Sequence, residues 1–148
     1  MAEKKNSGVN PDQIELGTDF KPNFNSQGLL PCIVVDHRSG EVLMFAWMNA
    51  EALSQTLQTK KATFFSRSRN KLWVKGEVSG RVLHVKQALV DCDQDVIQLK
   101  VEVAGEGVCH RGYRTCFYRA VDNLNPVKLE FVEDAPVFDP GDVYGGSE

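Results

Sequence analysis

A strict alternation of apolar and polar side chains between residues 97 and 103 constrains the fold of this chain more than any other feature. The apolar positions are Ile97, Leu99, Val101 and Val103, and the residues between them are Gln98, Lys100 and Glu102. A period of two predicts a strand with one buried face and one face toward solvent. We therefore expect this segment to lie in a sheet that covers the core on one side.

Further short strand patterns occur along the chain, whereas only one segment has a helical pattern. The strand candidates span residues 32–35, 42–48, 63–65, 71–75, 82–90, 117–118 and 129–132. The turn-forming run from Asp36 to Gly40 joins the first two candidates into a hairpin. Asn49 is a suitable N-cap for a helix from Ala50 to about Thr59. We predict a compact α+β domain, mainly antiparallel sheet with one or two short helices.

The length of 148 residues suits one domain, residues 1–148, with a single core. Residues 1–13 are expected to form a flexible lead-in, and residues from about 134 to 148 a surface tail. A net charge of −3 gives no basis for binding duplex nucleic acid. No segment has the pattern of a membrane span or a secretory signal, so we expect a cytoplasmic protein, where disulfides are rare.

Three carboxylates lie within five residues, between two strand candidates. They belong to Asp91, Asp93 and Asp95 of the run Asp-Cys-Asp-Gln-Asp. Carboxylates this close repel one another unless they are solvated or bind a cation, and such hard oxygen ligands suit Mg²⁺. The residues alone leave a magnesium site and a solvated acidic turn equally open.

Three of the four cysteines are candidate zinc ligands. Cys92 lies inside the acidic run, and Cys109 and Cys116 follow further along the chain. Three thiolates would leave the fourth coordination position open, as in a catalytic zinc site. Their spacing is not that of a standard zinc finger, so small buried side chains are the alternative. Cys32 lies in an apolar strand and is assigned to the core.

The three histidines have different expected roles. His110 adjoins Cys109 and is a candidate zinc ligand, general base or structural residue. We expect His37 to be exposed in its polar turn and His84 to have a structural role within a strand.

A basic loop between residues 66 and 80 combines cations, small residues and one aromatic side chain. Arginine suits bidentate phosphate contacts, glycine permits close backbone approach, and Trp73 can stack on a base. The composition fits a loop that binds phosphate and base, or a solvated basic hairpin anchored by Trp73. The candidate substrate-binding residues are Ser66, Arg67, Ser68, Arg69, Trp73, Lys75, Gly76, Glu77 and Ser79.

Taken together and in this order, these regions resemble the phosphoribosyl-AMP cyclohydrolase family of histidine biosynthesis. The matching stretches are residues 44–53, 65–69, 72–80, 91–95 and 109–117. Each stretch alone is moderately specific, but the combination is highly specific. It favours the binding interpretations of the basic loop, the cysteines and the aspartates.

The resemblance implies a homodimer with shared active sites, in which Cys92 of one subunit binds zinc together with Cys109 and Cys116 of the other. It implies Mg²⁺ on Asp91, Asp93 and Asp95. The implied substrate is phosphoribosyl-AMP. A zinc-activated water would attack its adenine ring and open the N1–C6 bond, with His110 as the candidate proton shuttle.

Two other functions share some of these features. A non-catalytic, zinc-stabilised nucleic-acid-binding module would use the basic loop and the cysteines, but a pI of about 5.6 and the carboxylates around Cys92 argue against it. A zinc deaminase of free nucleosides would need His-x-Glu and Pro-Cys-x-x-Cys signatures, which this sequence lacks.

Overall fold

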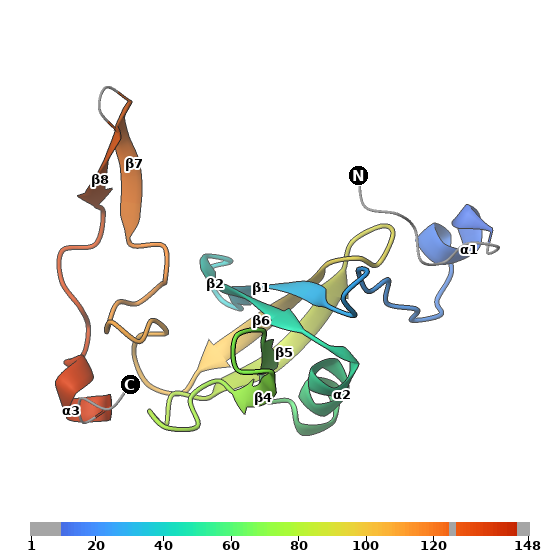
Figure 1. The fold of residues 1–148 in the computed structure, drawn as a ribbon, viewed down its shortest axis with the longest axis horizontal. Coiled ribbons are helices and arrows are strands. Elements are labelled where there is room, and N and C mark those ends of the chain that lie inside the picture. Colours follow the sequence, from blue (N-terminus) through green and yellow to red (C-terminus); the bar gives the residue numbers. More distant parts are fainter. Residues whose placement is uncertain (1–9, 125–126, 145–148) are drawn as a thin grey trace.

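The computed structural model describes residues 10–124 and 127–144. The elements are α1 (Pro11–Leu16), β1 (Leu30–Asp36), β2 (Val42–Met48), α2 (Ala50–Thr59), β3 (Thr63–Ser66), β4 (Lys71–Val74), β5 (Leu83–Val90), β6 (Ile97–Val103), β7 (Arg119–Leu124), β8 (Val127–Phe131) and α3 (Pro140–Tyr144). Figure 1 shows a body that contains β1–β6 and α2, with the β7–β8 hairpin projecting on one side and α1 lying on the other.

Four strands form the central sheet, in the order β2-β1-β6-β5. β1 pairs antiparallel with β2 and parallel with β6, and β5 pairs antiparallel with β6. The predicted alternation in β6 is confirmed, because Ile97, Leu99 and Val101 are buried while the residues between them are more exposed. The buried face of the sheet therefore faces the core.

The helix α2 and the small sheet of β3 and β4 contribute to that core. The side chain of Asn49 accepts a hydrogen bond from the N–H of Ala52 at 2.8 Å and caps the helix. Thr56, on the buried side of α2, donates from Oγ1 to the carbonyl of Thr63 at 3.1 Å and accepts from the N–H of Thr63 at 2.9 Å. These bonds fasten α2 to β3, whose Phe64 is fully buried.

The hairpin of β7 and β8, which we call the arm, carries a row of exposed apolar side chains. They are Val121, Val127, Leu129 and Phe131, each 53–64% exposed. The two strands pair antiparallel with each other in a sheet of their own. Two strands alone bury too little apolar surface for independent stability, so the arm needs further contacts.

The predicted α+β class and the mainly antiparallel pairing are confirmed, as are the hairpin of β1 and β2 and both ends of α2. The described residues form three helices instead of the one or two that we predicted. Residues 1–9 of the predicted lead-in lie outside the described residues, whereas Pro11–Leu16 form α1. The predicted strand at residues 117–118 begins only at Arg119.

Within the described part of the chain, no helix has the length and apolar character needed to cross a membrane.

Candidate active site

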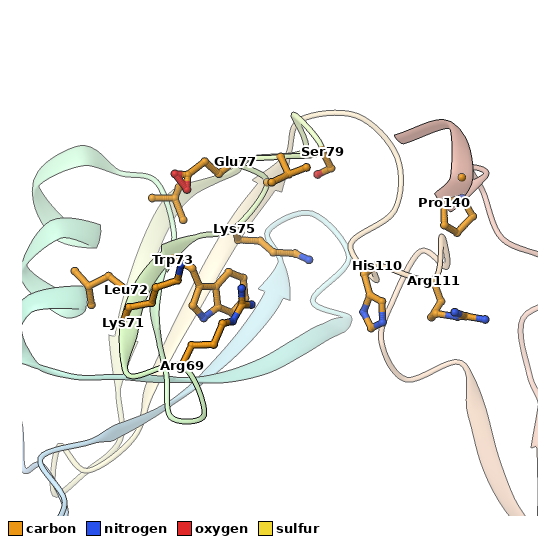
Figure 2. Close-up of a pocket in the computed structure, with 14 residues that line it drawn as sticks. Arg69, Lys71, Leu72, Trp73, Lys75, Glu77, Ser79, His110, Arg111 and Pro140 are labelled. Atoms are coloured by element: carbon orange, nitrogen blue, oxygen red, sulfur yellow. The ribbon is translucent and has the colours of Figure 1, made fainter. Parts of the chain in front are cut away.

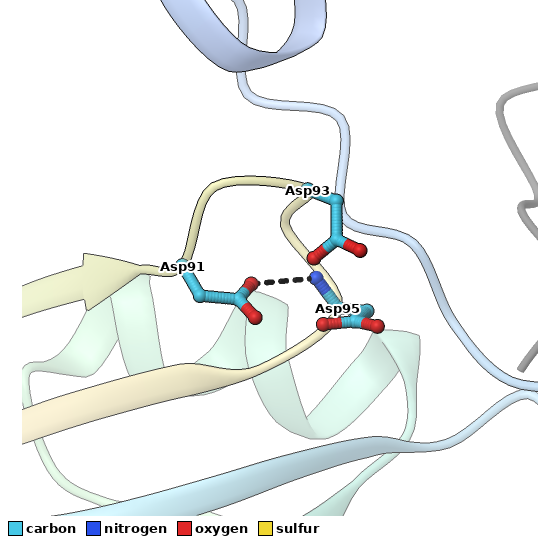
Figure 3. Close-up of side chains that lie close together, drawn as sticks. All are labelled: Asp91, Asp93 and Asp95. Carbon is cyan, nitrogen blue, oxygen red and sulfur yellow. Dashed lines mark hydrogen bonds between the residues drawn. The ribbon is translucent and has the colours of Figure 1, made fainter. Parts of the chain in front are cut away.

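The acidic run forms the turn between β5 and β6, as predicted, and brings its three carboxylates together. Carboxylate oxygens of Asp91, Asp93 and Asp95 all lie within 4.8 Å of one another (Figure 3). Asp91 fixes the turn, because its Oδ1 accepts hydrogen bonds from the N–H groups of Asp95 at 3.0 Å and Val96 at 3.2 Å. The turn thus presents three oxygen donors in a group that suits a hard divalent cation.

The electrostatics of this turn also fit a cation. Partial burial, followed by hydrogen bonds and repulsion from Asp91 and Asp93, raises the pKa of Asp95 to about 6. A carboxyl with such a raised pKa is one whose negative charge is not compensated by the protein. A bound Mg²⁺ would supply that compensation.

Cys109 and Cys116 lie in a second loop, which follows β6 and which we call the cysteine loop (residues 108–117). The loop is closed on itself, since the N–H groups of Val108 and Cys109 both donate to the carbonyl of Tyr113, at 3.2 Å and 3.1 Å. It is held to β2, because the N–H of Cys116 donates to the carbonyl of Leu43 at 2.8 Å.

Thr115 strengthens this attachment to β2, and sequence reasoning had given it no role. Its side chain is buried, and its Oγ1 lies 2.9 Å from the carbonyl of Val42 and 3.2 Å from that of Leu43. The same oxygen accepts from the N–H of Phe117 at 3.1 Å. A threonine between basic and sulfur-containing residues gives no sequence signal for this role, because the two carbonyls on β2 lie more than seventy residues away.

The two thiols of the cysteine loop interact with each other through a hydrogen bond. A hydrogen bond from Cys116 lowers the pKa of Cys109 to about 6, with smaller contributions from the N–H of Arg111 and the charges of His110 and Lys75. The same hydrogen bond raises the pKa of Cys116. Two sulfur atoms that interact in this way could both be ligands of one metal ion.

Cys92 does not join this pair within one chain. Among residues 10–124 and 127–144, the aspartate trio is the only group of three or more Cys, His, Asp or Glu ligand atoms within 4.8 Å. Cys92 precedes β6 and Cys109 follows it, and seven residues of strand cover roughly 23 Å at about 3.3 Å per residue. Cys92 is exposed in the turn between β5 and β6, where a second chain could reach it.

A cavity of about 770 Å³ lies between the basic loop, the cysteine loop and the start of α3. Figure 2 shows Trp73 and Lys75 on one side of it and His110 and Arg111 on the other. From the predicted substrate-binding set, this cavity is lined by Arg69, Trp73, Lys75, Gly76, Glu77 and Ser79. The structure thus brings His110 to the same cavity as most of that set.

A second cavity of about 870 Å³ shares Arg69 and Trp73 with the first. It takes in the remaining predicted residues, Ser66, Arg67 and Ser68, together with Trp47 from β2. The guanidinium of Arg67 lies over the ring of Trp47, 5.0 Å from its centroid. Trp73 packs against buried Phe64, with ring centroids 5.1 Å apart, so it anchors the loop to the core as well as lining both cavities.

The segment after the arm lies on the cysteine loop and is more than a surface tail. The N–H of Val137 donates to the carbonyl of Gly112 at 2.7 Å. Gly112 has φ of +92°, and a Cβ there would collide with the carbonyl of Phe138, so only glycine allows this approach. Glycine is required at position 76 for a similar reason, because a Cβ there would collide with the backbone of Arg81. Its positive φ is part of the turn that the basic loop makes at this point.

The remaining cysteine and histidines lie elsewhere. Cys32 is fully buried in β1, as predicted, and burial raises its pKa to about 12. The prediction that His37 is exposed was wrong, because its ring is largely covered and its Nε2 lies 3.6 Å from a carboxylate oxygen of Glu102 on β6. That neighbour comes from a distant part of the sequence. His84 is exposed on β5.

Comparison with known proteins gives one consistent result. The sequence profile named "Phosphoribosyl-AMP cyclohydrolase" matches residues 44–118. A protein of that name from Rhizobium leguminosarum bv. trifolii is 53% identical over 135 residues, covering 89% of each chain. One from Methanothermobacter thermautotrophicus is 52% identical, covering 89% of this chain and 94% of the relative. A third, from Rhodopseudomonas palustris, is 45% identical and covers 97% of this chain and 99% of the relative.

Proposed function

The chain belongs to the phosphoribosyl-AMP cyclohydrolase family, hydrolases of histidine biosynthesis, and from this premise we propose how its residues carry out the reaction. The substrate is 1-(5-phosphoribosyl)-AMP, whose second phosphoribosyl group on N1 makes the neighbouring C6 electrophilic. Water adds at C6, the N1–C6 bond breaks, and N1 takes a proton. The product is a formimino-imidazole-carboxamide ribotide. The observation that carries this assignment is the common cavity of Trp73, Lys75 and His110, with a pair of hydrogen-bonded thiols in the same loop as His110.

Zinc is held, in this proposal, by Cys109 and Cys116 of one chain and Cys92 of a second. The hydrogen bond between the first two thiols and the exposure of Cys92 before the start of β6 support this set. Zinc on three thiolates would leave one position open, and it lowers the pKa of a bound water toward ~7, which supplies the nucleophile.

Mg²⁺ is held by the aspartate trio. The mutual distances of the carboxylates and the raised pKa of Asp95 support it. A turn that carries three carboxylates would repel a phosphorylated substrate, and cation binding would reverse that repulsion.

His110 is the proposed proton shuttle. Its side chain is exposed and projects into the cavity opposite Trp73 (Figure 2). A neutral imidazole that lines the cavity can accept a proton from the attacking water and return it to N1.

The two phosphates of the substrate are expected to occupy the two cavities. Lys71, Lys75 and Arg111 line the first cavity, and Arg67 lines the second. Arg69 lies at the boundary and reaches both. Guanidinium groups suit bidentate phosphate contacts, and the indole of Trp73 at the boundary can contact the base.

A homodimer with shared active sites completes the proposal. The exposed apolar side chains of the arm need a partner surface, and Phe131 extends an aromatic cluster with Tyr113 and Tyr118, whose rings stack at 4.0 Å. A second copy that covers the arm would stabilise it through apolar burial. The four cysteines are free thiols, and the reducing cytoplasm would keep Cys92, Cys109 and Cys116 available for metal.

A single assay tests the function. The purified protein, supplied with zinc and Mg²⁺, is mixed with phosphoribosyl-AMP, and the ultraviolet spectrum is followed as the purine ring opens. His110→Asn should retain both metals and lower kcat by about 10²–10⁴-fold. Ammonia release from AMP or adenosine would instead identify a deaminase, and absence of turnover with binding of single-stranded RNA would identify the non-catalytic module.

A further inference from the structure

Gln94, in the middle of the acidic turn, is buried although both neighbouring aspartates are more exposed. Only 5% of its surface is exposed, and its φ of +61° is in the left-handed region, which a residue with a long side chain seldom adopts. This backbone conformation turns the side chain of Gln94 inward while Asp93 and Asp95 stay on the outside of the turn. The strained conformation is held by the N–H of Gln94, which donates to the carbonyl of Asp91 at 3.1 Å, and by the contacts that the side chain makes.

Those contacts all go to the backbone of one segment, residues 14–23, which we call the strap. Oε1 of Gln94 accepts from the N–H of Lys21 at 2.8 Å, and its Nε2 donates to the carbonyls of Ile14 at 3.3 Å and Asp19 at 3.2 Å. The backbone carbonyl of Gln94 also accepts from the N–H of Asn23 at 2.8 Å. The amide thus uses both of its donor hydrogens and one acceptor position on the strap.

The strap buries little of its own surface along most of its length. Ile14 and Asn23 at its ends are buried, but residues 15–21 between them are all exposed. A path across the surface that buries so little apolar area is determined by its polar contacts. Figure 3 shows the strap passing close to the turn that carries Asp93 and Asp95.

We propose that Gln94 is a positioning residue for the cation site: by fixing the strap against the acidic turn, it holds the three carboxylates at the separation that a divalent cation needs. The inference rests on the Mg²⁺ site of the proposed function. Groups that orient metal ligands typically change metal affinity by about 10–100-fold when they are removed. Because coupling is reciprocal, cation binding should in turn hold the strap more firmly.

The test measures cation affinity directly, with Mn²⁺ as a paramagnetic substitute for Mg²⁺ and with no substrate present. Gln94→Met keeps the length of the side chain but makes none of the three side-chain hydrogen bonds, and we expect its Kd for Mn²⁺ to rise about tenfold. Gln94→Gly relieves the left-handed conformation and should weaken binding equally, since the contacts are lost. Gln58→Met, which alters an exposed glutamine on α2, is the matched control and should leave the Kd unchanged.

A second measurement uses substitutions in the strap instead of at Gln94, so it does not depend on whether the Gln94 variants fold. Lys21→Pro removes the N–H that Oε1 accepts, whereas Lys21→Ala keeps it, so only the proline variant should bind Mn²⁺ more weakly. In the unaltered protein, addition of Mg²⁺ should slow hydrogen exchange at the N–H groups of Lys21 and Asn23.

Two results would overturn the inference. One is that Gln94→Gly and Lys21→Pro bind Mn²⁺ with the affinity of the unaltered protein. The other is that hydrogen exchange at the N–H groups of the strap does not change when Mg²⁺ binds. A wrong assignment of the Mg²⁺ site would give a different result, because the unaltered protein would then bind no Mn²⁺ at the aspartate trio. In that case both the proposed site and this inference would be wrong.

Discussion

Replacement of Thr115 by valine should loosen the cysteine loop from the central sheet. The side chains have nearly the same volume, so packing is retained while the hydroxyl is lost. Oγ1 of Thr115 donates to the carbonyl of Val42 at 2.9 Å, and the carbonyl of Leu43 lies 3.2 Å away. The same oxygen accepts from the N–H of Phe117 at 3.1 Å. Thr115 is only 2% exposed. Leaving a buried donor or acceptor without a partner costs about 1–3 kcal/mol.

The expected loss in the free energy of unfolding is therefore about 1–3 kcal/mol in Thr115→Val. The hydrogen bond from Cys116 to Leu43 remains in the variant, so the loop should stay attached and still bind zinc, but more weakly. Urea unfolding of the metal-free protein gives the first quantity, and competition with a chromophoric chelator gives the zinc affinity.

Thr59→Val is the matched control. The hydroxyl of Thr59 also donates to a carbonyl, that of Gln55 at 2.8 Å, and accepts from an N–H, that of Lys61 at 3.1 Å, but it is exposed. Water can replace it, so the stability should change by less than about 0.5 kcal/mol. Equal losses in both variants, or no loss in Thr115→Val, would refute the reasoning from burial.

Three further predictions concern the metals. Asp93→Asn, which removes charge but little volume, should sharply weaken Mg²⁺ activation while mass spectrometry still detects bound zinc; unchanged Mg²⁺ activation would contradict the assignment. Mixed Cys92→Ala and Cys109→Ala subunits should regain activity through heterodimers with one intact site, and background activity after confirmed subunit exchange would mean that zinc is bound within one chain. Because the folded state raises the pKa of Asp95 to about 6, the native metal-free protein binds more protons than the unfolded chain between about pH 4 and 6. Its stability should therefore fall as pH rises through that window, and a pH series of urea unfolding curves should lose this slope in Asp95→Asn or in excess Mg²⁺.

The parts of the molecule that depend on neighbours in sequence were predictable. The alternation in β6, the hairpin of β1 and β2, the N-cap at Asn49 and the turn of the three aspartates all follow from local patterns, and the structure has each of them. The predicted residues of the basic loop line the two cavities, and this grouping was predictable because they lie within one short stretch of chain.

The parts that depend on distant segments were not predictable. Nothing near His37 indicates Glu102, and nothing near Thr115 indicates the carbonyls of β2. The sequence indicated no role for Gln94, because it does not reveal the left-handed backbone that directs the side chain onto the strap. These residues act through partners that only the folded chain brings near them.

The parallel pairing of β1 with β6 has a consequence for the order in which the protein folds. Cys32 pairs with Ile97, so a large part of the chain separates the two central strands. The chain loses conformational entropy when such a long loop closes, before the hydrogen bonds between the two strands stabilise it. Sheets with pairings between distant strands therefore form slowly. During synthesis the hairpin of β1 and β2 leaves the ribosome first. The edge of β1 that pairs with β6 stays unpaired until β6 has also left the ribosome. We expect refolding to be limited by the docking of the β5–β6 hairpin on β1, and substitutions at Leu99 to slow refolding more than substitutions at Leu43.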